Sequence, residues 1–432
     1  MNLTAALRYL DHHTNLEATA GRAEGLSLDR MRALVGALGD PQLAYPVIHI
    51  TGTNGKGSVA RMVTSLLREA GLGVGTYTSP HLEQINERIS YDGEPIGDED
   101  LAGAIAAVAA VEDLAGIVPS YFEILTAAAF VHFADRAVDV AVVEVGMLGR
   151  WDATNVVEAA VAVLTNVGRD HTDGEGDWRR AIAEEKAGIV KPTSTFVCGE
   201  TGDDLRELLA STPAERTWWR GTDFDCDQHV LAVGGRSLEL RTPHHVVDDV
   251  PLPLHGAHQA DNAAIALAAV EAFFDRALDD EVVREGFAAV TVPGRFEVVH
   301  REPTVVLDAA HNLDGAETCA ETLRDEFTLS GTLIYVTGFL GGRDSRDMLE
   351  ALGAGDAGFL VACTPESPRA IPAPEVAAAA DALGIVAEAV PNVADAVERA
   401  LALAGADDFV LVTGSLYVVG PARALLRTEV DA

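Results

Sequence analysis

The sequence predicts an α/β protein in which parallel sheets are covered by helices on both faces. Short apolar runs typical of buried strands alternate along the chain with segments of helical spacing, and this order favours parallel sheets. Of the 432 residues, 48% are hydrophobic and only 6% are aromatic, so a full core can be built mainly from aliphatic side chains. The predicted strands are residues 45–50, 139–145, 161–166, 304–308, 332–337, 358–363 and 408–413.

Length and local composition predict two main domains. Residues 223–255 differ from the rest, because short alternating runs and prolines at 243, 251 and 253 favour a small β segment. A long helical stretch, 257–289, is followed by the Pro293-Gly294-Arg295 turn and a new series of strands. We therefore expect a first domain over residues 1–292 and a smaller one over 293–432.

The chain is strongly acidic along its whole length. Lys and Arg total 31 against 67 Asp and Glu, which gives a formal net charge of −36 and a pI of about 4.5. The negative net charge disfavours nucleic acid and anionic membranes as partners, since both bind basic surfaces. Acidic residues are dispersed along the chain, and lysine occurs only three times. This composition leads to the hypothesis that the protein is adapted to a salt-rich cytoplasm.

Cysteine usage and the lack of targeting signals predict a cytoplasmic protein. The four cysteines are far apart and form no C-x-x-C pair, so we expect free thiols in a reducing compartment. No charged-then-apolar leader opens the sequence, and apolar runs such as 101–111 are too short to span a bilayer. We expect the protein to be a monomer.

The glycine-rich segment HITGTNGKGS (49–58) predicts a phosphate-binding loop. A strand-like run precedes it and the helical stretch 59–70 follows it, which is the context that such a loop needs. The spacing departs from G-x-x-x-x-G-K-[ST], since a glycine separates the lysine from the serine. A plain glycine turn is the alternative, but the context favours nucleotide binding. The predicted phosphate-binding residues are Gly52, Thr53, Asn54, Gly55, Lys56, Gly57 and Ser58.

The scarcity of lysine draws attention to two positions. A chain that uses arginine elsewhere is expected to keep lysine where a guanidinium would fail, and Lys56 in a tight phosphate cradle fits that expectation. Lys186 lies in the segment EEKAG (184–188), where pairing with the neighbouring acids would accept arginine equally well. We therefore predict either chemistry on the Lys186 amine or a site too tight for arginine.

Acidic and histidine side chains follow two of the predicted strands. Glu144 comes at the end of one strand, where a carboxylate can bind magnesium near a phosphate loop. Asp170 and His171 follow another. A histidine in such a pair usually caps a turn or has its hydrogen bonds satisfied within the fold. The expected position of this pair beside the phosphate loop and Glu144 favours a metal role instead.

These motifs together resemble the folylpolyglutamate synthase/dihydrofolate synthase branch of the Mur ligase superfamily. The resemblance runs in family order across nearly the whole chain. It rests on HITGTNGKGS (49–58), TSPHLEQINERI (78–89), YFEILTAAAF (121–130), VEVGMLGRWDATN (143–155), LTNVGRDH (164–171), IAEEKAGIVK (182–191), HGAHQADNAAIA (255–266), PGRFE (293–297), VLDAAHNLDG (306–315), TPESPRAIPAPEVA (364–377) and VTGSLYVVG (412–420).

The resemblance implies an ATP-dependent carboxylate–amine ligase. ATP would phosphorylate a carboxylate, and the amine of L-glutamate would attack the acyl phosphate and release phosphate. The implied acceptors are dihydropteroate and folates, and we favour a bifunctional enzyme over a monofunctional one. The implied fold is a P-loop Mur-ligase-like domain plus a smaller Rossmann-like C-terminal domain, with the active site in the cleft between them and domain closure completing it.

The resemblance also carries roles onto individual residues. ATP would lie on the loop 52–58, with Asn262 and Arg295 holding the nucleotide and Asp308 and His311 facing nucleotide and glutamate. Lys186 matches a lysine that carbon dioxide carbamylates in this family. The implied magnesium ligands are Ser58, Ser79, Glu144 and His171, and the implied substrate contacts are Phe122, Asp152, Ala153, Ser415 and Tyr417.

Two departures from the family pattern stand out. Met147-Leu148 replaces the Leu-Gly of many relatives, so a side chain stands at 148 where they have none. Arg343 stands in the region where relatives often carry D-K-D, in keeping with the general avoidance of lysine. Neither departure removes a group that the chemistry needs.

Other functions stay open at this point. A Mur-type ligase acting on a cell-wall precursor is disfavoured by the TSPHL and EKAGI segments (78–82 and 185–189). A phosphotransferase using the same loop would turn over ATP without glutamate. A nucleotide-binding scaffold without turnover is disfavoured by the joint presence of the two lysines, Glu144, His171, Asp308 and His311.

Overall fold

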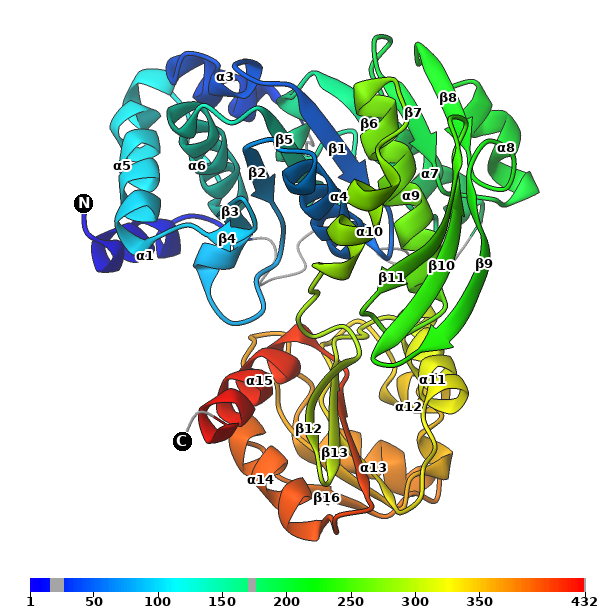
Figure 1. The fold of residues 1–432 in the computed structure, drawn as a ribbon. Coiled ribbons are helices and arrows are strands. Elements are labelled where there is room, and N and C mark those ends of the chain that lie inside the picture. Colours follow the sequence, from blue (N-terminus) through cyan, green and yellow to red (C-terminus); the bar gives the residue numbers. More distant parts are fainter. Residues whose placement is uncertain (16–26, 170–175, 431–432) are drawn as a thin grey trace. The chain divides into compact units, whose positions relative to one another are not determined.

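The computed structural model describes residues 1–15, 27–169 and 176–430 (Figure 1). The chain divides into two compact units. The first holds Met1–Pro253 with Gln259–Thr291, and the second holds Leu254–His258 with Val292–Ala432. In the described part of the chain, no helix is long and apolar enough to cross a membrane. The predicted Asp170-His171 pair lies outside the described residues.

The first unit is built on an eight-stranded sheet with the order β4-β3-β2-β5-β1-β6-β7-β8. Pairing is parallel from β2 to β8, whereas β3 and β4 are antiparallel. The prediction of parallel sheets is therefore correct for the centre and wrong at this edge, because a short hairpin needs no helical crossover. The strands are β1 Val47–Thr51, β2 Val74–Tyr77, β3 Ile89–Tyr91, β4 Glu94–Pro95, β5 Val140–Glu144, β6 Ala159–Leu164, β7 Thr195–Cys198 and β8 Arg216–Trp219.

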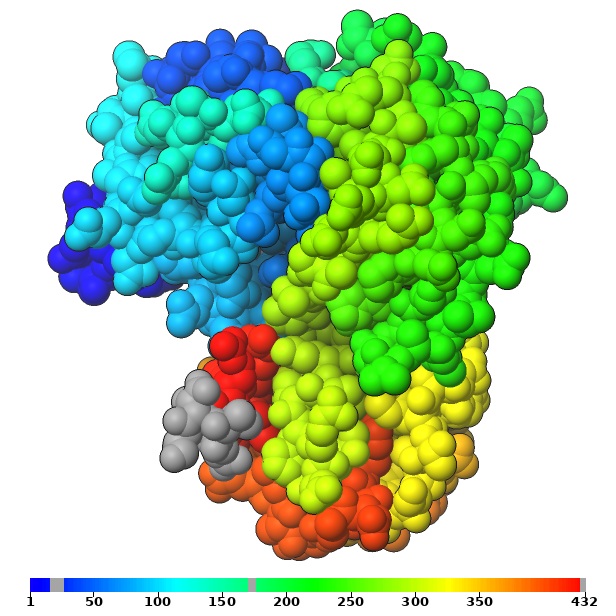
Figure 2. Space-filling view, viewed as in Figure 1, coloured from blue at the N-terminus to red at the C-terminus, as the bar shows by residue number. Residues whose placement is uncertain are grey.

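Helices cover both faces of this sheet. On β2, Thr76 bonds Thr64 of α4 with 2.6 Å between hydroxyl oxygens, while Tyr77 lies on the opposite face and its hydroxyl accepts from Thr126 of α6. α10 packs along α4, and the two segments lie side by side in Figure 2. The helices are α1 Leu3–Asp11, α3 Asp29–Ala37, α4 Lys56–Glu69, α5 Asp98–Ala115, α6 Tyr121–Arg136, α7 Trp178–Ala187, α8 Asp203–Ala210, α9 His258–Phe274 and α10 Asp280–Ala288.

The predicted β segment at 223–255 is confirmed as a separate three-stranded antiparallel sheet, in the order β11-β10-β9. Its strands are β9 Asp225–Ala232, β10 Gly235–Arg241 and β11 Val246–Leu252. β10 is the central strand and alternates buried and partly exposed residues, whereas β9 is largely exposed. The sheet therefore buries one face and leaves an edge strand in solvent.

The second unit has a six-stranded sheet with the order β12-β13-β17-β14-β15-β16. All pairs are parallel except β12–β13. Its strands are β12 Glu297–Arg301, β13 Thr304–Asp308, β14 Leu333–Thr337, β15 Phe359–Ala362, β16 Ala387–Ala389 and β17 Phe409–Thr413, and its helices are α11 Leu313–Glu326, α12 Ser345–Ala351, α13 Ala373–Ala382, α14 Val393–Leu403 and α15 Leu416–Val430.

Candidate active site

The phosphate loop joins the end of β1 to the start of α4. Gly55 precedes the helix with a φ of 84°, and no side chain caps this helix start in the described structure. The first N–H groups of a helix have no partner within the helix, so this end suits an anion. Lys56 folds back over the loop, and its Nζ donates to the carbonyls of Gly52 and Thr53 at 3.0 Å each.

The segment that follows β6 holds the loop in place. Asn54 donates its N–H to Asn166 Oδ1 at 3.0 Å, and the Thr165 hydroxyl donates to the carbonyl of Asn54 at 2.6 Å. Gly168 N donates to Thr53 Oγ1 at 3.0 Å. The motif LTNVGRDH (164–171) includes this segment, but the sequence did not predict that its side chains hydrogen-bond to the phosphate loop. The spacing of residues along a chain does not reveal which loops contact each other.

Glycine is required at Gly55 for two separate reasons. Its φ is positive, and an added Cβ would lie 2.4 Å from Oδ1 of Asn262 on α9. The structure thereby brings Asn262, predicted to hold the nucleotide, directly against the loop.

We expect Gly55→Ala to destabilise the protein more than Gly71→Ala does. The two glycines have similar φ values, 84° and 89°, so each alanine carries a similar backbone strain of roughly 1–2 kcal/mol. Nothing lies within 4 Å of an added Cβ at Gly71, so only the Gly55 variant must also displace Asn262. Urea unfolding measures both losses of free energy, and equal losses would contradict the steric argument.

The predicted magnesium ligands lie around the same helix start. Glu144 ends β5 next to β1 and is buried, and its Oε2 accepts from the backbone N of Ser79 at 3.1 Å. An added Cβ at Gly57 would lie 3.7 Å from the same oxygen, so the carboxylate lies beside the first turn of α4, where Ser58 is buried. His171 lies outside the described residues.

Among residues 1–15, 27–169 and 176–430, no group of three or more His, Cys, Asp or Glu gathers as a metal site. One buried carboxylate with nearby hydroxyls is nonetheless a hard oxygen donor set, which suits magnesium that keeps several waters and phosphate oxygens. The residues present therefore fit such an ion as a partner of bound phosphates, not as a caged structural metal.

Lys56 and Lys186 line one small pocket. Lys186 lies near the end of α7 and is only 4% exposed. The other lining residues are Gly52, Thr53, Gly146, Met147 and Leu148. The sequence predicted both lysines separately, and the fold brings them to the same place.

α7 is fixed close against the segment that follows β5. Arg150 N donates to the carbonyl of Glu185 at 2.8 Å, and an added Cβ at Gly149 would lie 2.7 Å from that same oxygen. Burial raises the pKa of the Glu185 carboxyl, while the charge of Arg150 opposes the rise. This close packing sets the depth at which Lys186 enters the pocket.

Three of the predicted substrate contacts, Phe122, Asp152 and Ala153, lie on the same segment or against it. The ring of Phe122 on α6 fills the space that a Cβ at Gly146 would need, with Cζ at 2.4 Å. The carboxylate of Asp152 accepts from Met147 N at 2.9 Å and from Thr154 N at 3.0 Å. Ala153 follows as the first residue of the short 3-10 helix η3, Ala153–Val156. Asp152 thus already has a structural role in shaping this loop, and its contact with a substrate stays a prediction.

His49 on β1 is buried close to this loop. Its Nε2 lies 2.9 Å from the hydroxyl of Thr154. Burial, helped by the charge of Lys191, lowers the pKa of His49 from 6.5 to about 3, so the ring is neutral at physiological pH. Sequence reasoning missed His49 as a functional candidate, because a histidine within an apolar strand is usually a satisfied core residue.

We expect the wild-type protein to lose stability from about pH 6.5 downward in a way that His49→Gln does not. An unfolded histidine takes up a proton near pH 6.5, whereas folded His49 does so only near pH 3. The unfolded state then binds more protons, which costs up to about 1.4 kcal/mol per pH unit between these values. Urea unfolding of both proteins at pH 7 and pH 5 measures the difference between their free energies of unfolding. A difference that is the same at both pH values would contradict the prediction.

In the second unit, the predicted residues gather where strands end. Thr413 pairs with both Asp308 and Thr337, so β13, β17 and β14 end level. The carboxylate of Asp308 accepts from Phe296 N and Ala310 N at 2.9 Å each. Burial raises the pKa of Asp308, and the charge of Arg295 opposes the rise.

The remaining predicted residues follow these strand ends. His311 Nδ1 lies 3.0 Å from the carbonyl of Ala309, and Asn312 caps α11. After β17, buried Ser415 accepts from the backbone N of Tyr417 at 3.2 Å, at the start of α15. Carboxyl ends of parallel strands are where open α/β sheets bind ligands, so this edge is well placed for a substrate.

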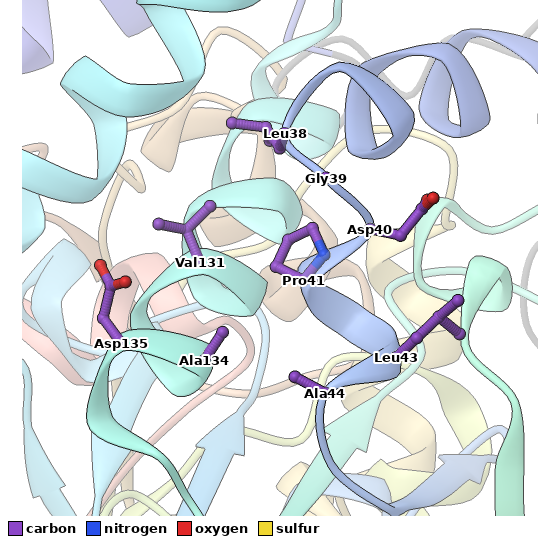
Figure 3. Close-up of a pocket in the computed structure, with 9 residues that line it drawn as sticks. All are labelled: Leu38, Gly39, Asp40, Pro41, Leu43, Ala44, Val131, Ala134 and Asp135. Carbon is purple, nitrogen blue, oxygen red and sulfur yellow. The ribbon is translucent and has the colours of Figure 1, made fainter.

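A wider hollow lies elsewhere on the first unit, between the end of α3 and the side of α6 (Figure 3). Two carboxylates, Asp40 and Asp135, line it together with apolar side chains. Its described lining contains no lysine, arginine or histidine, so it offers nothing to hold a triphosphate. The prediction that the nucleotide binds the phosphate loop is therefore unaffected by this hollow.

Two family models match the two units of the chain. Residues 50–270 match the Mur ligase middle domain, and residues 294–416 match the glutamate ligase domain of Mur ligases. The two α/β units are therefore those of a Mur-type ligase. The dihydrofolate synthase/folylpolyglutamate synthase of Mycobacterium tuberculosis is 42% identical over 445 residues, covering 93% of this chain and 90% of that protein. The chain belongs to the dihydrofolate synthase/folylpolyglutamate synthase family, and it is an ATP-dependent ligase.

Solved structures of the family have the same fold. The folylpolyglutamate synthase of Mycobacterium tuberculosis, complexed with ADP and AMPPCP, superposes with a TM-score of 0.90 at 40% identity, covering 98% of each chain. The bifunctional folylpolyglutamate synthase/dihydrofolate synthase of Yersinia pestis, complexed with AMPPNP and a Mn ion, gives 0.85 at 29% identity and covers 99% of this chain and 98% of that one.

Proposed function

We propose that this ligase is bifunctional, adding L-glutamate both to dihydropteroate and to the γ-carboxylate of reduced folates. A free carboxylate is a poor electrophile, and phosphorylation by ATP gives it a leaving group that the glutamate amine can displace. The observation that carries the proposal of two acceptors is the 42% identity, over 93% of this chain, to a relative named for both activities, and the pocket shared by Lys56 and Lys186 on the phosphate loop supports the ligase chemistry. Lys56 can offset the charge of a phosphoryl group bound at the loop while that group moves to the acceptor.

Each residue near the loop has a distinct role in this proposal. The start of α4 and the Lys56 ammonium bind phosphate oxygens and offset their charge. Glu144, with Ser58, Ser79 and His171, would hold magnesium, which neutralises phosphate charge when bound. Asn262 orients the nucleotide beside the loop. In the second unit, Arg295, Asp308, His311, Ser415 and Tyr417 would serve nucleotide and glutamate.

We also propose that carbon dioxide carbamylates Lys186. Lys186 is buried and lines the same pocket as Lys56 on the phosphate loop, so a group formed on its amine would lie beside bound phosphates. Carbamylation converts this amine into an anion that can support magnesium. The same reaction is impossible for arginine, which explains why this chain keeps a lysine at a position that is 4% exposed.

ADP release tests the function. Wild-type protein is assayed with ATP and magnesium at high salt, with and without glutamate, using dihydropteroate or tetrahydrofolate as the acceptor. Turnover that needs glutamate with both acceptors supports the bifunctional ligase, and turnover with one acceptor makes the enzyme monofunctional. Glutamate-independent turnover would indicate a phosphotransferase, and no turnover with either acceptor would favour a Mur-type ligase acting on another carboxylate.

We propose a cytoplasmic monomer that needs salt for stability. The four cysteines are free, as a reducing compartment requires. With a net charge of −36, carboxylates repel one another across the surface, and salt screens that repulsion. Light scattering with size exclusion measures the oligomeric state.

We expect the thermal midpoint to rise steeply with potassium chloride. Sucrose at matched osmolality is the control, because it does not screen charge. A midpoint that is already maximal in dilute buffer would refute the salt adaptation.

A further inference from the structure

Strand β1 does more than lead into the phosphate loop. In the sheet it lies between β5 and β6, so the segment that joins those two strands, residues 145–158, has to pass it. His49 and Thr51 are two apart on β1 and so project from the same face. Both side chains bond to that connecting segment, and both are buried.

The first contact is a relay of three side chains. The Thr154 hydroxyl donates to Asp152 Oδ1 at 2.5 Å, so it must accept the hydrogen bond from His49 Nε2–H at 2.9 Å. The other oxygen of Asp152 accepts from the backbone N of Met147. His49 is thereby linked through two side chains to the backbone at the edge of the pocket.

The second contact is direct. The Thr51 hydroxyl donates to the backbone carbonyl of Leu148 at 2.5 Å. Leu148 has a φ of 60°, a conformation that a leucine adopts only when its surroundings impose it. The hydrogen bond from Thr51 is one such constraint, and it acts where many relatives have glycine.

Both contacts end on Met147 and Leu148, which line the pocket with Lys56 and Lys186. Gly52, the first residue of the phosphate loop, directly follows Thr51. One strand therefore sets the position of the loop that holds ATP and of the opposite wall of the same pocket. Phosphoryl transfer needs donor and acceptor oxygens in line within a few tenths of an ångström, so such shared positioning matters.

We propose that His49 and Thr51 are positioning residues for the acceptor carboxylate, acting through the segment Gly146–Ala153. They touch neither nucleotide nor acceptor. They hold the backbone at Met147 and Leu148 so that the acceptor meets the γ-phosphate on the loop. This inference rests on the proposed ligase function.

The test compares Thr51→Val, which removes the hydroxyl at nearly constant volume, with Thr51→Ser, which keeps it. Thr154→Val and Thr154→Ser form the same pair for the relay. We expect the valine variants to lower kcat/KM for the acceptor by about tenfold to a hundredfold, with ADP affinity by calorimetry close to wild type. The serine variants should stay near wild type.

A second readout does not depend on activity. Hydrogen exchange of the amides in 146–153 should quicken in the valine variants and not in the serine variants, whichever acceptor the enzyme uses. Wild-type protein without ligase activity would refute the proposed function, while unchanged exchange in Thr51→Val would refute the positioning role. A loss shared equally by ADP affinity and acceptor kcat/KM would also overturn it, because that pattern indicates general destabilisation.

Discussion

Lys56→Ala is expected to abolish ATP turnover while leaving a folded protein. The Lys56 Nζ donates to two carbonyls of its own loop, so the variant loses only about 1–3 kcal/mol of stability. In the reaction, the same ammonium offsets charge on the phosphoryl group in transit, and removing such a group typically lowers kcat by at least about a hundredfold. ADP release and thermal unfolding, measured on one preparation, check both statements.

Lys56→Arg should fail as well, because a planar guanidinium does not replace a compact ammonium within the loop. Arg346→Ala is the matched control, since it removes one positive charge from an exposed helical pair with Glu350. That control should keep wild-type turnover. Ligase activity retained in Lys56→Ala would refute the assignment of Lys56.

Lys186→Arg is expected to lose turnover although arginine has the same charge as an unmodified lysine. The site is 4% exposed and packed against the backbone of the segment after β5, so a larger guanidinium does not fit without displacing it. Arginine also cannot take up carbon dioxide to form the proposed carbamate. We expect a loss of at least about a hundredfold in kcat, measured by ADP release.

Lys191→Arg is the matched control for this experiment. Lys191 is the remaining lysine of the chain, and its Nζ makes ordinary hydrogen bonds to Asn155, at 2.9 Å to Oδ1. Arginine can make those bonds, so this variant should stay active. Wild-type enzyme should also lose activity in carbon dioxide-free buffer and regain it with bicarbonate. Activity in Lys186→Arg, or indifference to bicarbonate, would exclude the carbamate.

Much of the fold was predictable because long apolar runs carry their own signal. All seven predicted strands are present, from β1 at Val47–Thr51 to β17 at Phe409–Thr413. The missed strands are short or irregular: β4 has two residues, β2, Val74–Tyr77, contains a glycine, and the five-residue β12 has a register shift. In runs of two to four residues, periodicity does not separate a strand from a loop. Pairing with a neighbour, which the sequence does not display, makes these segments strands.

The start of α4 shows a similar limit. The helical pattern predicted a start at Val59, whereas the helix begins at Lys56. Glycines at 55 and 57 have poor helix propensity, so the segment resembled a loop. The left-handed conformation of Gly55 instead ends the loop early and opens the helix with Lys56 in its first turn.

Within the site, sequence reasoning found the residues but not their relations. It singled out Lys56 from the glycine-rich loop and from lysine usage, Lys186 from lysine usage, and Glu144 from its place at a strand end. It did not show that both lysines line one pocket, that Asn262 touches Gly55, or that the oxygens of Asp152 are already taken by the loop. Those relations join residues up to about 200 positions apart, and only packing of the sheet brings them together.

By itself, the sequence determined the class of chemistry: a glycine-rich loop between strand and helix, two lysines at positions where we expect arginine to fail, and the motifs of one ligase family. Such features depend on residue type and local spacing, which a linear chain displays in full. Tertiary structure alone decided that β1 lies between β5 and β6, and so that His49 and Thr51 meet the segment after β5. Sheet order arises from pairing between distant segments, and no local pattern records it.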